Sequence, residues 1–240
     1  MSNNAHRAEL LSEPAHPRPA LDPGTHRTQE GAIRPSGAGA ATGAAMRLFV
    51  AIAPPPAVLD ELDELVEPLR SRRQDLRWTN REAWNVTLAF LGQADEPTAA
   101  RLVQRLGRAA LGHDDIQLAF SGAGAFPYAG RANVLWTGLS GDRVALARLA
   151  ESVVAGAAHA GTPPPGKGRR FQPHLTLARC RMPADVTELA AALNDYQGPS
   201  WTADRVHLVR SRLHASEQPR YSSLASWPLR ALDRDTDPAS

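Results

Sequence analysis

The sequence predicts an α+β fold with two lobes, each built from a sheet and its helices. Strand-like and helix-like segments interleave along the chain, and several strand candidates are joined by short loops, which argues against a doubly wound parallel sheet. One six-residue pattern also occurs twice, and each copy precedes a helix-like segment. We therefore expect two structurally related halves rather than one continuous sheet.

The folded region is expected to begin at Met46. Residues 1–45 contain five prolines, five glycines and no aromatic residue, so they offer too little apolar surface to offset the entropy of ordering. We predict a disordered N-terminal extension there, or a start assigned too far upstream of a true start at Met46. The two-lobed domain is expected over 46–232, and a short disordered tail over 233–240.

The first half of the domain reads as strand, helix, strand, helix. Residues 46–53 form an apolar run of strand length, and the apolar residues of 58–69 recur at i, i+3, i+4 and i+7, the spacing of an amphipathic helix. Residues 84–92 read as a strand closed by a glycine. Residues 97–111 read as a second helix, with Asp95 or Glu96 near its positive end.

The second half continues the alternation. The expected elements, in order, are strands over 115–126 and 131–139, a helix over 142–159, a Pro- and Gly-rich loop over 162–170, a strand over 171–179, a helix over 183–195, and strands over 201–213 and 220–229.

Composition excludes several classes of protein. The 27 basic and 25 acidic residues leave a net charge of +2, which argues against binding nucleic acid by bulk electrostatics alone. No apolar run approaches the ~18 residues of a membrane span, and no secretion signal is visible. Cys180 is the only cysteine, so an internal disulfide and a CxxC zinc site are excluded. We expect a cytoplasmic protein without membrane contact.

The repeated pattern reads Asn-Val-Thr-Leu-Ala-Phe at 85–90 and His-Leu-Thr-Leu-Ala-Arg at 174–179. Because residues i and i+2 of a strand share a face, Asn85 and Thr87 should lie on one face, as should His174 and Thr176. The apolar residues between them should enter each lobe's core. If the two strands meet, four polar side chains converge on one cleft of a size that fits a phosphate group.

Strict alternation also makes predictions for the ends of both patterns. It places Phe90 in the core. It also places Arg179 on the face opposite the polar one, and we expect Arg179 to form a structural salt bridge there. His207, in the strand candidate near the C-terminus, is interpreted as a packed or surface histidine.

These segments together resemble a known family. The matching stretches are 47–55, 77–92, 171–179 and the two C-terminal strands, in order and at suitable spacing. The chain resembles the two-histidine phosphoesterases, in particular the RNA 2′,3′-cyclic phosphodiesterases once called 2′-5′ RNA ligases. The resemblance implies two pseudo-twofold-related lobes, each an antiparallel sheet with helices on its outer face, enclosing a central cleft with one H-x-T-x tetrapeptide per lobe.

In that family one histidine protonates the leaving 3′-oxygen, the other activates water, and the threonines hold phosphate. The resemblance therefore implies that His174 is catalytic and that Thr87 and Thr176 bind phosphate. Arg131 stands where family members often carry an arginine near the cleft, and it is interpreted either as a further phosphate contact or as an ordinary surface arginine. Asn85 occupies the first histidine's position. An amide hydrogen-bonds but transfers no proton near neutral pH, and losing a general acid or base costs about 10²–10⁴-fold in rate.

The expected activity is hydrolysis of RNA 2′,3′-cyclic phosphate termini to 2′-phosphomonoesters by metal-independent acid–base catalysis, weakened by Asn85. No cofactor or metal is implied, the partners are RNA ends or cyclic nucleotides, and no oligomer is implied. Two alternatives remain open: a catalytically degenerate member that binds RNA ends or nucleotides, and 2′-5′ RNA ligation at the same site.

Overall fold

The computed structural model describes residues 45–163, 171–212 and 220–231. Apart from residue 45, the predicted disordered extension lies outside this part of the chain, as does the predicted C-terminal tail. Most of the expected loop over 162–170 also lies outside it. Among the described residues, no helix combines the length and apolar character needed to cross a membrane.

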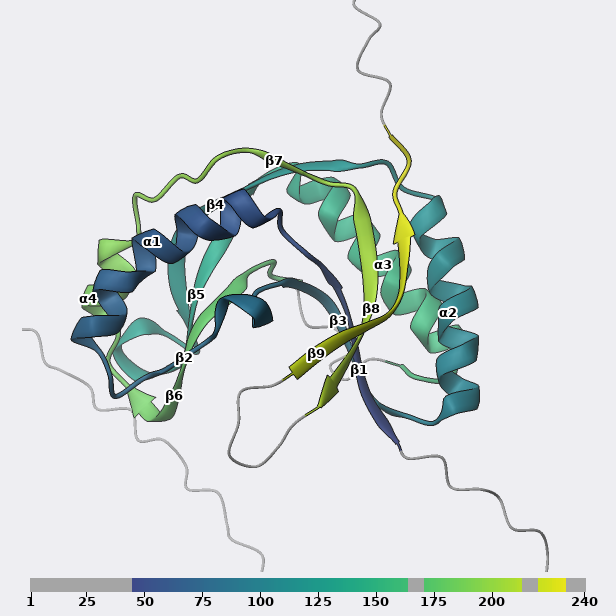
Figure 1. The fold of residues 1–240 in the computed structure, drawn as a ribbon, viewed down its shortest axis with the longest axis horizontal. Coiled ribbons are helices and arrows are strands. Elements are labelled where there is room, and N and C mark those ends of the chain that lie inside the picture. Colours follow the sequence, from purple (N-terminus) through teal and green to yellow (C-terminus); the bar gives the residue numbers. More distant parts are fainter. Residues whose placement is uncertain (1–44, 164–170, 213–219, 232–240) are drawn as a thin grey trace, which may run out of the picture. The chain divides into compact units, whose positions relative to one another are not determined.

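Two antiparallel sheets form the domain (Figure 1). Sheet A has the strand order β3-β1-β8-β9, and sheet B has the order β2-β6-β5-β4-β7. The strands of sheet A are β1 (Met46–Ile52), β3 (Val86–Ala94), β8 (Arg205–Arg212) and β9 (Arg220–Pro228). Those of sheet B are β2 (Arg77–Trp78), β4 (Ile116–Phe126), β5 (Ala132–Gly141), β6 (Leu175–Ala184) and β7 (Trp201–Ala203).

The helices begin and end close to the predicted positions. They are α1 (Pro56–Arg72), α2 (Glu96–Leu111), α3 (Arg143–His159) and α4 (Thr187–Ala192), with short 3-10 turns η1 (Arg81–Ala83) and η2 (Ala129–Arg131). Asp95 caps α2 by accepting a hydrogen bond from the Thr98 backbone N–H at 2.9 Å. The helix expected over 183–195 is shorter, because β6 continues to Ala184.

Two helices reach away from the sheet that contains the strand before them. α3 follows β5 of sheet B but packs against α2 and β3 of sheet A. α1 follows β1 of sheet A but reaches the α4 region, where Arg73, just after its end, donates to the backbone oxygen of Asp185 at 3.0 Å. Figure 1 shows α2 and α3 together beside sheet A, and α1 and α4 together beside sheet B. The predicted α+β class, with two antiparallel sheets and helices packed against them, is confirmed.

Side-chain alternation gives sheet A two different faces. Leu48, Val50 and Ile52 are at most 1% exposed and belong to the main hydrophobic core. On the opposite face, Phe49 and Ala51 form a separate small apolar cluster with Val209 of β8. We call this second face the site face of sheet A, because Thr87 pairs with Ala51 on it.

Both motif strands contain a β-bulge, and it overturns two predictions made from strict alternation. Ala51 pairs with Thr87 and Val50 with Ala89, which leaves Leu88 as an extra residue on β3. Leu88 and Ala89 are consequently both buried, and Phe90 is 56% exposed instead of lying in the core. An extra residue in a strand reverses the faces of the residues that follow it.

The bulge recurs at the equivalent position of β6. Leu135 pairs with Ala178 and Trp136 with Thr176, so Leu177 is the extra residue. Leu177 and Ala178 are both fully buried, and Arg179 returns to the exposed face that carries Thr176. The expectation that Arg179 lies off this face is therefore wrong. We call this the site face of sheet B.

One further prediction was wrong at the C-terminal side. The single strand expected over 201–213 is divided at Asp204 into β7, which pairs with β4 in sheet B, and β8, which pairs with β1 in sheet A. The chain thus crosses from one sheet to the other within one extended segment, a step that periodicity alone does not reveal.

Candidate functional site

The two sequence patterns are also repeats in three dimensions. Asn85 directly precedes β3 and His174 directly precedes β6, and Thr87 and Thr176 are half-buried as the second residue of each strand. The first residue of each sequence pattern, Asn85 or His174, donates a side-chain hydrogen bond to the carbonyl oxygen two residues earlier. Asn85 Nδ2 bonds to Ala83 at 2.9 Å, and His174 Nδ1 bonds to Gln172 at 2.8 Å.

His174 is held with one ring nitrogen committed and the other available. Because Nδ1 faces a carbonyl acceptor, it carries the hydrogen, and Nε2 keeps its lone pair in the neutral ring. Burial lowers the pKa of His174, the carbonyl of Gln172 opposes this by stabilising the charged form, and the positive charge of Arg179 lowers the pKa further. The imidazole is therefore a neutral base near pH 7.

Aromatic rings of sheet B support this imidazole. Phe126 meets the ring edge-on with centroids 5.0 Å apart, and Trp136 lies 6.0 Å away. The Trp136 indole lies over Gly124 of the neighbouring strand, where any Cβ would collide with it. The absent side chain at Gly124 thus leaves room for the indole beside His174.

Asn85 uses both ends of its amide locally. Its Oδ1 accepts a hydrogen bond from the Thr87 hydroxyl at 2.9 Å, while Nδ2 donates to the Ala83 carbonyl. These two bonds also fix the amide orientation, because only the NH₂ end can face a carbonyl oxygen. The hydroxyl hydrogen of Thr87 is consequently engaged by Asn85, and only its lone pairs remain for a ligand.

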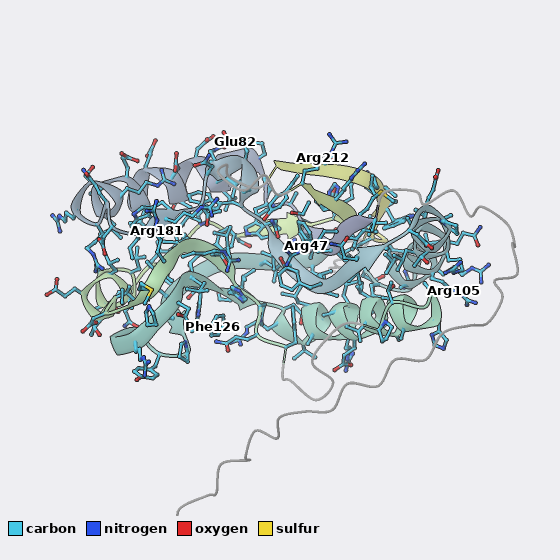
Figure 2. All side chains as sticks on the ribbon, turned by 90° about the horizontal axis from the view of Figure 1, so that it is seen from below. Arg47, Glu82, Arg105, Phe126, Arg181 and Arg212 are labelled. Atoms are coloured by element: carbon cyan, nitrogen blue, oxygen red, sulfur yellow. The ribbon has the colours of Figure 1, made fainter. Side chains whose placement is uncertain are left out.

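A hollow of about 160 Å³ lies on the site face of sheet A next to Asn85. Ala51 and Ala53 form part of its floor, and His207, Tyr221 and Ser223 of β8 and β9 contribute to its lining. Glu82 of η1 lines it as well; Figure 2 labels Glu82 near α1 and Phe126 on sheet B. The hollow therefore brings Asn85 together with a histidine that the sequence interpretation placed in a packed or surface position.

Arg179 connects the two site faces electrostatically. It lies three residues after Thr176 on the site face of sheet B, and its charge lowers the pKa of His174 in that sheet. Burial raises the pKa of Tyr221 in sheet A, and the charge of Arg179 partly offsets that rise. A guanidinium at this position suits an anion held between the two sheets.

The structure does not bring Arg131 to the same place. Arg131 is exposed at the end of η2, directly before Ala132, which pairs with Ala184 at the far end of β6. Trp136, the partner of Thr176, lies five residues further along, which corresponds to about 16 Å at the rise of a strand. The phosphate contact of Arg131 remains a prediction.

Comparison with known proteins shows the family of the chain. The model of the 2′-5′ RNA ligase superfamily matches residues 54–215 of the chain. The chain belongs to this superfamily. The resemblance stated from the sequence motifs is thereby confirmed.

Relatives within the superfamily include proteins named RNA 2′,3′-cyclic phosphodiesterase. The relative from Aeropyrum pernix is 31% identical over 147 residues, which are 60% of this chain and 80% of that protein. The relative from Archaeoglobus fulgidus is 32% identical over 139 residues, which are 57% and 73% of the two chains. That from Thermotoga maritima is 28% identical over 169 residues, 70% and 88% of the chains.

Solved structures share the superfamily fold. A protein of Thermus thermophilus matches with a TM-score of 0.62 and 28% identity, over 78% of this chain and 99% of its own. E. coli LigT, crystallised with 3′-AMP, matches with a TM-score of 0.61 and 24% identity, over 77% and 98% of the two chains.

Sequence reasoning missed two residues of the site, His207 and Arg179. The adjacent leucine and alanine after each threonine are the local signal for Arg179, because two consecutive buried residues in a half-buried strand indicate a bulge. His207 has no comparable local signal, since its place depends on which strand lies next to β1. Across the described residues, no group of three or more His, Cys, Asp or Glu side chains could hold a metal ion.

Proposed function

We propose that this protein opens the terminal 2′,3′-cyclic phosphate of RNA by hydrolysis to a 2′-phosphomonoester, without a metal ion. The single observation that carries the proposal is the neutral, half-buried His174, whose Nε2 is left available by the bond at Nδ1 while Thr176 and Arg179 share its strand and face. The names of the relatives from Aeropyrum pernix and Thermotoga maritima support the choice of substrate.

The residues divide the reaction between them. Arg179 and the Thr176 hydroxyl hold the phosphodiester, with Thr87 joining them only when its hydroxyl turns away from Asn85, and His174 Nε2 takes a proton from a water molecule as its oxygen attacks phosphorus. The bond from phosphorus to the 3′-oxygen then breaks, and that oxygen takes up a proton to leave a 3′-hydroxyl and a 2′-phosphate. Asn85 cannot supply this proton, because an amide does not ionise near neutral pH.

A second function is favoured by the bonding of Asn85. Asn85 has both ends of its amide engaged by Ala83 and Thr87 and transfers no proton, so the sheet A motif lacks a group that would turn a bound ligand over. A degenerate member that binds RNA ends or nucleotides is therefore the competing proposal. Ligation of 2′-5′ RNA ends would use the same residues in reverse.

The deciding experiment uses the full chain and a short RNA that ends in a 2′,3′-cyclic phosphate, with a chelator present. We expect conversion to the 2′-phosphate, identified by mass spectrometry and by its sensitivity to phosphatase. The same RNA with a plain 3′-hydroxyl end is the matched control and should remain unchanged. Saturable binding of the cyclic end with no product over many hours would instead support the binding protein.

A further inference from the structure

We infer that His207 is the second imidazole of this site and takes the proton-donating role that Asn85 cannot perform. This inference rests on the proposed function. His207 lies in β8, far from both motifs in the sequence, yet it lines the same hollow as Asn85. It donates the proton that the leaving 3′-oxygen requires.

The strand register places His207 on the site face of sheet A. Ala51 of β1 pairs with Thr87 on one side and with His207 on the other, so the three residues form one row across the sheet. Neighbouring strands lie about 4.8 Å apart, so the backbones of Thr87 and His207 are about 10 Å apart, with only the methyl group of Ala51 between them. An imidazole can reach over a methyl group towards a phosphate that lies in the hollow between the two strands.

Small side chains keep the space between β3 and β8 open. Ala53 continues the floor from Ala51 and lies beside Asn85, since Ile52 pairs with Val86. A larger residue at either alanine would fill the hollow that separates Asn85 from His207. The hollow thus extends from Asn85, directly before β3, to His207 in β8.

The hydrogen bonds of His207 leave the correct nitrogen available. The Ser223 hydroxyl donates to the Ala225 carbonyl at 3.2 Å, so its oxygen accepts from His207 Nδ1, which lies 3.4 Å away. The hydrogen of the neutral ring is therefore on Nδ1, and Nε2 is the atom that gains and loses a proton. This matches the arrangement at His174, where Nδ1 is also the committed nitrogen.

Several titratable groups surround this imidazole. Glu82 and Tyr221 line the hollow from η1 and β9, Arg205 is the first residue of β8, and Asp204 directly precedes it. Burial lowers the pKa of His207, Arg205 lowers it further, and Asp204 raises it. A bound phosphodiester adds a negative charge to the hollow, which stabilises the imidazolium and raises the pKa of His207. Substrate binding therefore favours the protonated form of His207 that donates to the 3′-oxygen.

Protons and bonds balance across the two histidines. Water gives one proton to His174 Nε2 as its oxygen bonds to phosphorus, and the phosphorus–3′-oxygen bond breaks. Nε2 of the His207 imidazolium gives one proton to that oxygen. The product is a 2′-phosphomonoester with a free 3′-hydroxyl, and the two histidines exchange their protons with solvent to restore the starting state.

The test compares His207→Gln with His159→Gln, a matched change at an exposed histidine at the end of α3. Glutamine keeps the reach of the side chain but transfers no proton. On the cyclic-phosphate RNA, we expect kcat/KM to fall about 10²-fold or more for His207→Gln and to stay within about threefold for His159→Gln. The alkaline limb of the pH–rate profile, which reports the protonated acid, should disappear only in His207→Gln.

A relocated histidine sharpens the same test. Asn85→His should gain less than about tenfold in the parent chain, which already has a donor, but should recover about 10²-fold in the His207→Gln chain. In parallel, NMR should show the His207 imidazole resonance titrating at higher pH when 2′-AMP is bound, by about half a pH unit or more.

The outcomes separate this inference from the proposed function. An active parent with His207→Gln within threefold and an unchanged pH profile overturns the role of His207 and leaves the function standing. An inactive parent removes the hydrolytic function; His207 then stands as a phosphate contact if 2′-AMP raises its pKa, and is rejected if its titration is unchanged.

Discussion

Sheets A and B each contain one motif strand, β3 or β6, and the two strands share their backbone features but end in different side chains. Each motif strand begins with a side chain tethered to the carbonyl two residues back, continues with a half-buried threonine, and bulges at the following leucine. The two copies share an aliphatic second position, Val86 or Leu175, and differ in chemical type at the first and sixth positions of the pattern. Sheet A has Asn85 and Phe90 there, and sheet B has His174 and Arg179.

This difference concerns the two motif strands: the copy in sheet B ends in a charged residue, and the copy in sheet A ends in an aromatic one. Sheet B contributes a neutral base and a guanidinium on one face. Sheet A instead presents aromatic rings, with Phe49 at 6.2 Å from Phe90 and 5.0 Å from Tyr221 between ring centroids. The backbone of the two motifs is thus the same although the side chains differ. The bulge depends on main-chain pairing, and either an amide or an imidazole donor can bond to the carbonyl two residues earlier.

The largest effect is expected at the first motif position. His174→Gln should lower kcat/KM by about 10²–10⁴-fold, because it removes the general base, whereas Asn85→Ala should cost less than about fivefold. In the pH–rate profile of the parent protein, the acid-side decline of the rate should lie below pH 6.5. Burial and the charge of Arg179 lower the pKa of His174, and its neutral form is the one that acts as the base. Equal losses in the two variants, both folded by circular dichroism, would contradict the assignment of roles.

Stability should separate the bulged residue Leu88 from Phe90, which follows it by two positions in β3. Leu88 is 4% exposed and Phe90 is 56% exposed. Leu88→Ala should therefore lower the free energy of unfolding by about 2–5 kcal/mol, and Phe90→Ala by less than about 1 kcal/mol. Urea denaturation measures both; a larger loss for Phe90 would mean that strict alternation holds and the bulge is absent.

Arg179, the sixth residue of the motif in sheet B, can be compared with Arg131, the phosphate contact predicted from the sequence. Arg179→Ala should raise KM or lower kcat/KM by about 10- to 100-fold, the range for losing a charged hydrogen bond of about 1.5–3 kcal/mol. Arg131→Ala serves as the comparison and should change kcat/KM less than threefold, given its distance along β5. If the order is reversed, the phosphate contact belongs to Arg131.

The smallest effects should distinguish the two threonines. Thr176→Val should lower kcat/KM by about tenfold, the equivalent of one hydrogen bond of roughly 1–1.5 kcal/mol. Thr87→Val should have less effect, because the hydroxyl hydrogen of Thr87 is already donated to Asn85. In the Asn85→Ala background the Thr87 hydroxyl is released, so Thr87→Val should then cost as much as Thr176→Val. Threonine variants of equal cost in the parent would show that the bond to Asn85 opens on binding.

The sequence by itself determined the parts that depend on short-range pattern. The apolar residues of α1, the Asp95 cap of α2 and the paired motifs could all be read locally, because helix period, cap chemistry and strand alternation are properties of neighbouring residues. Family membership followed from the same motifs.

Only the tertiary structure decided which residues meet. The register of β3 on β1 and of β6 on β5 created the bulges that expose Phe90 and Arg179. The insertion of β8 between β1 and β9 brought His207 into the row of Thr87, although the two residues are remote in the chain. Such neighbours follow from hydrogen-bond pairing and core packing over the whole domain, and no local propensity encodes them.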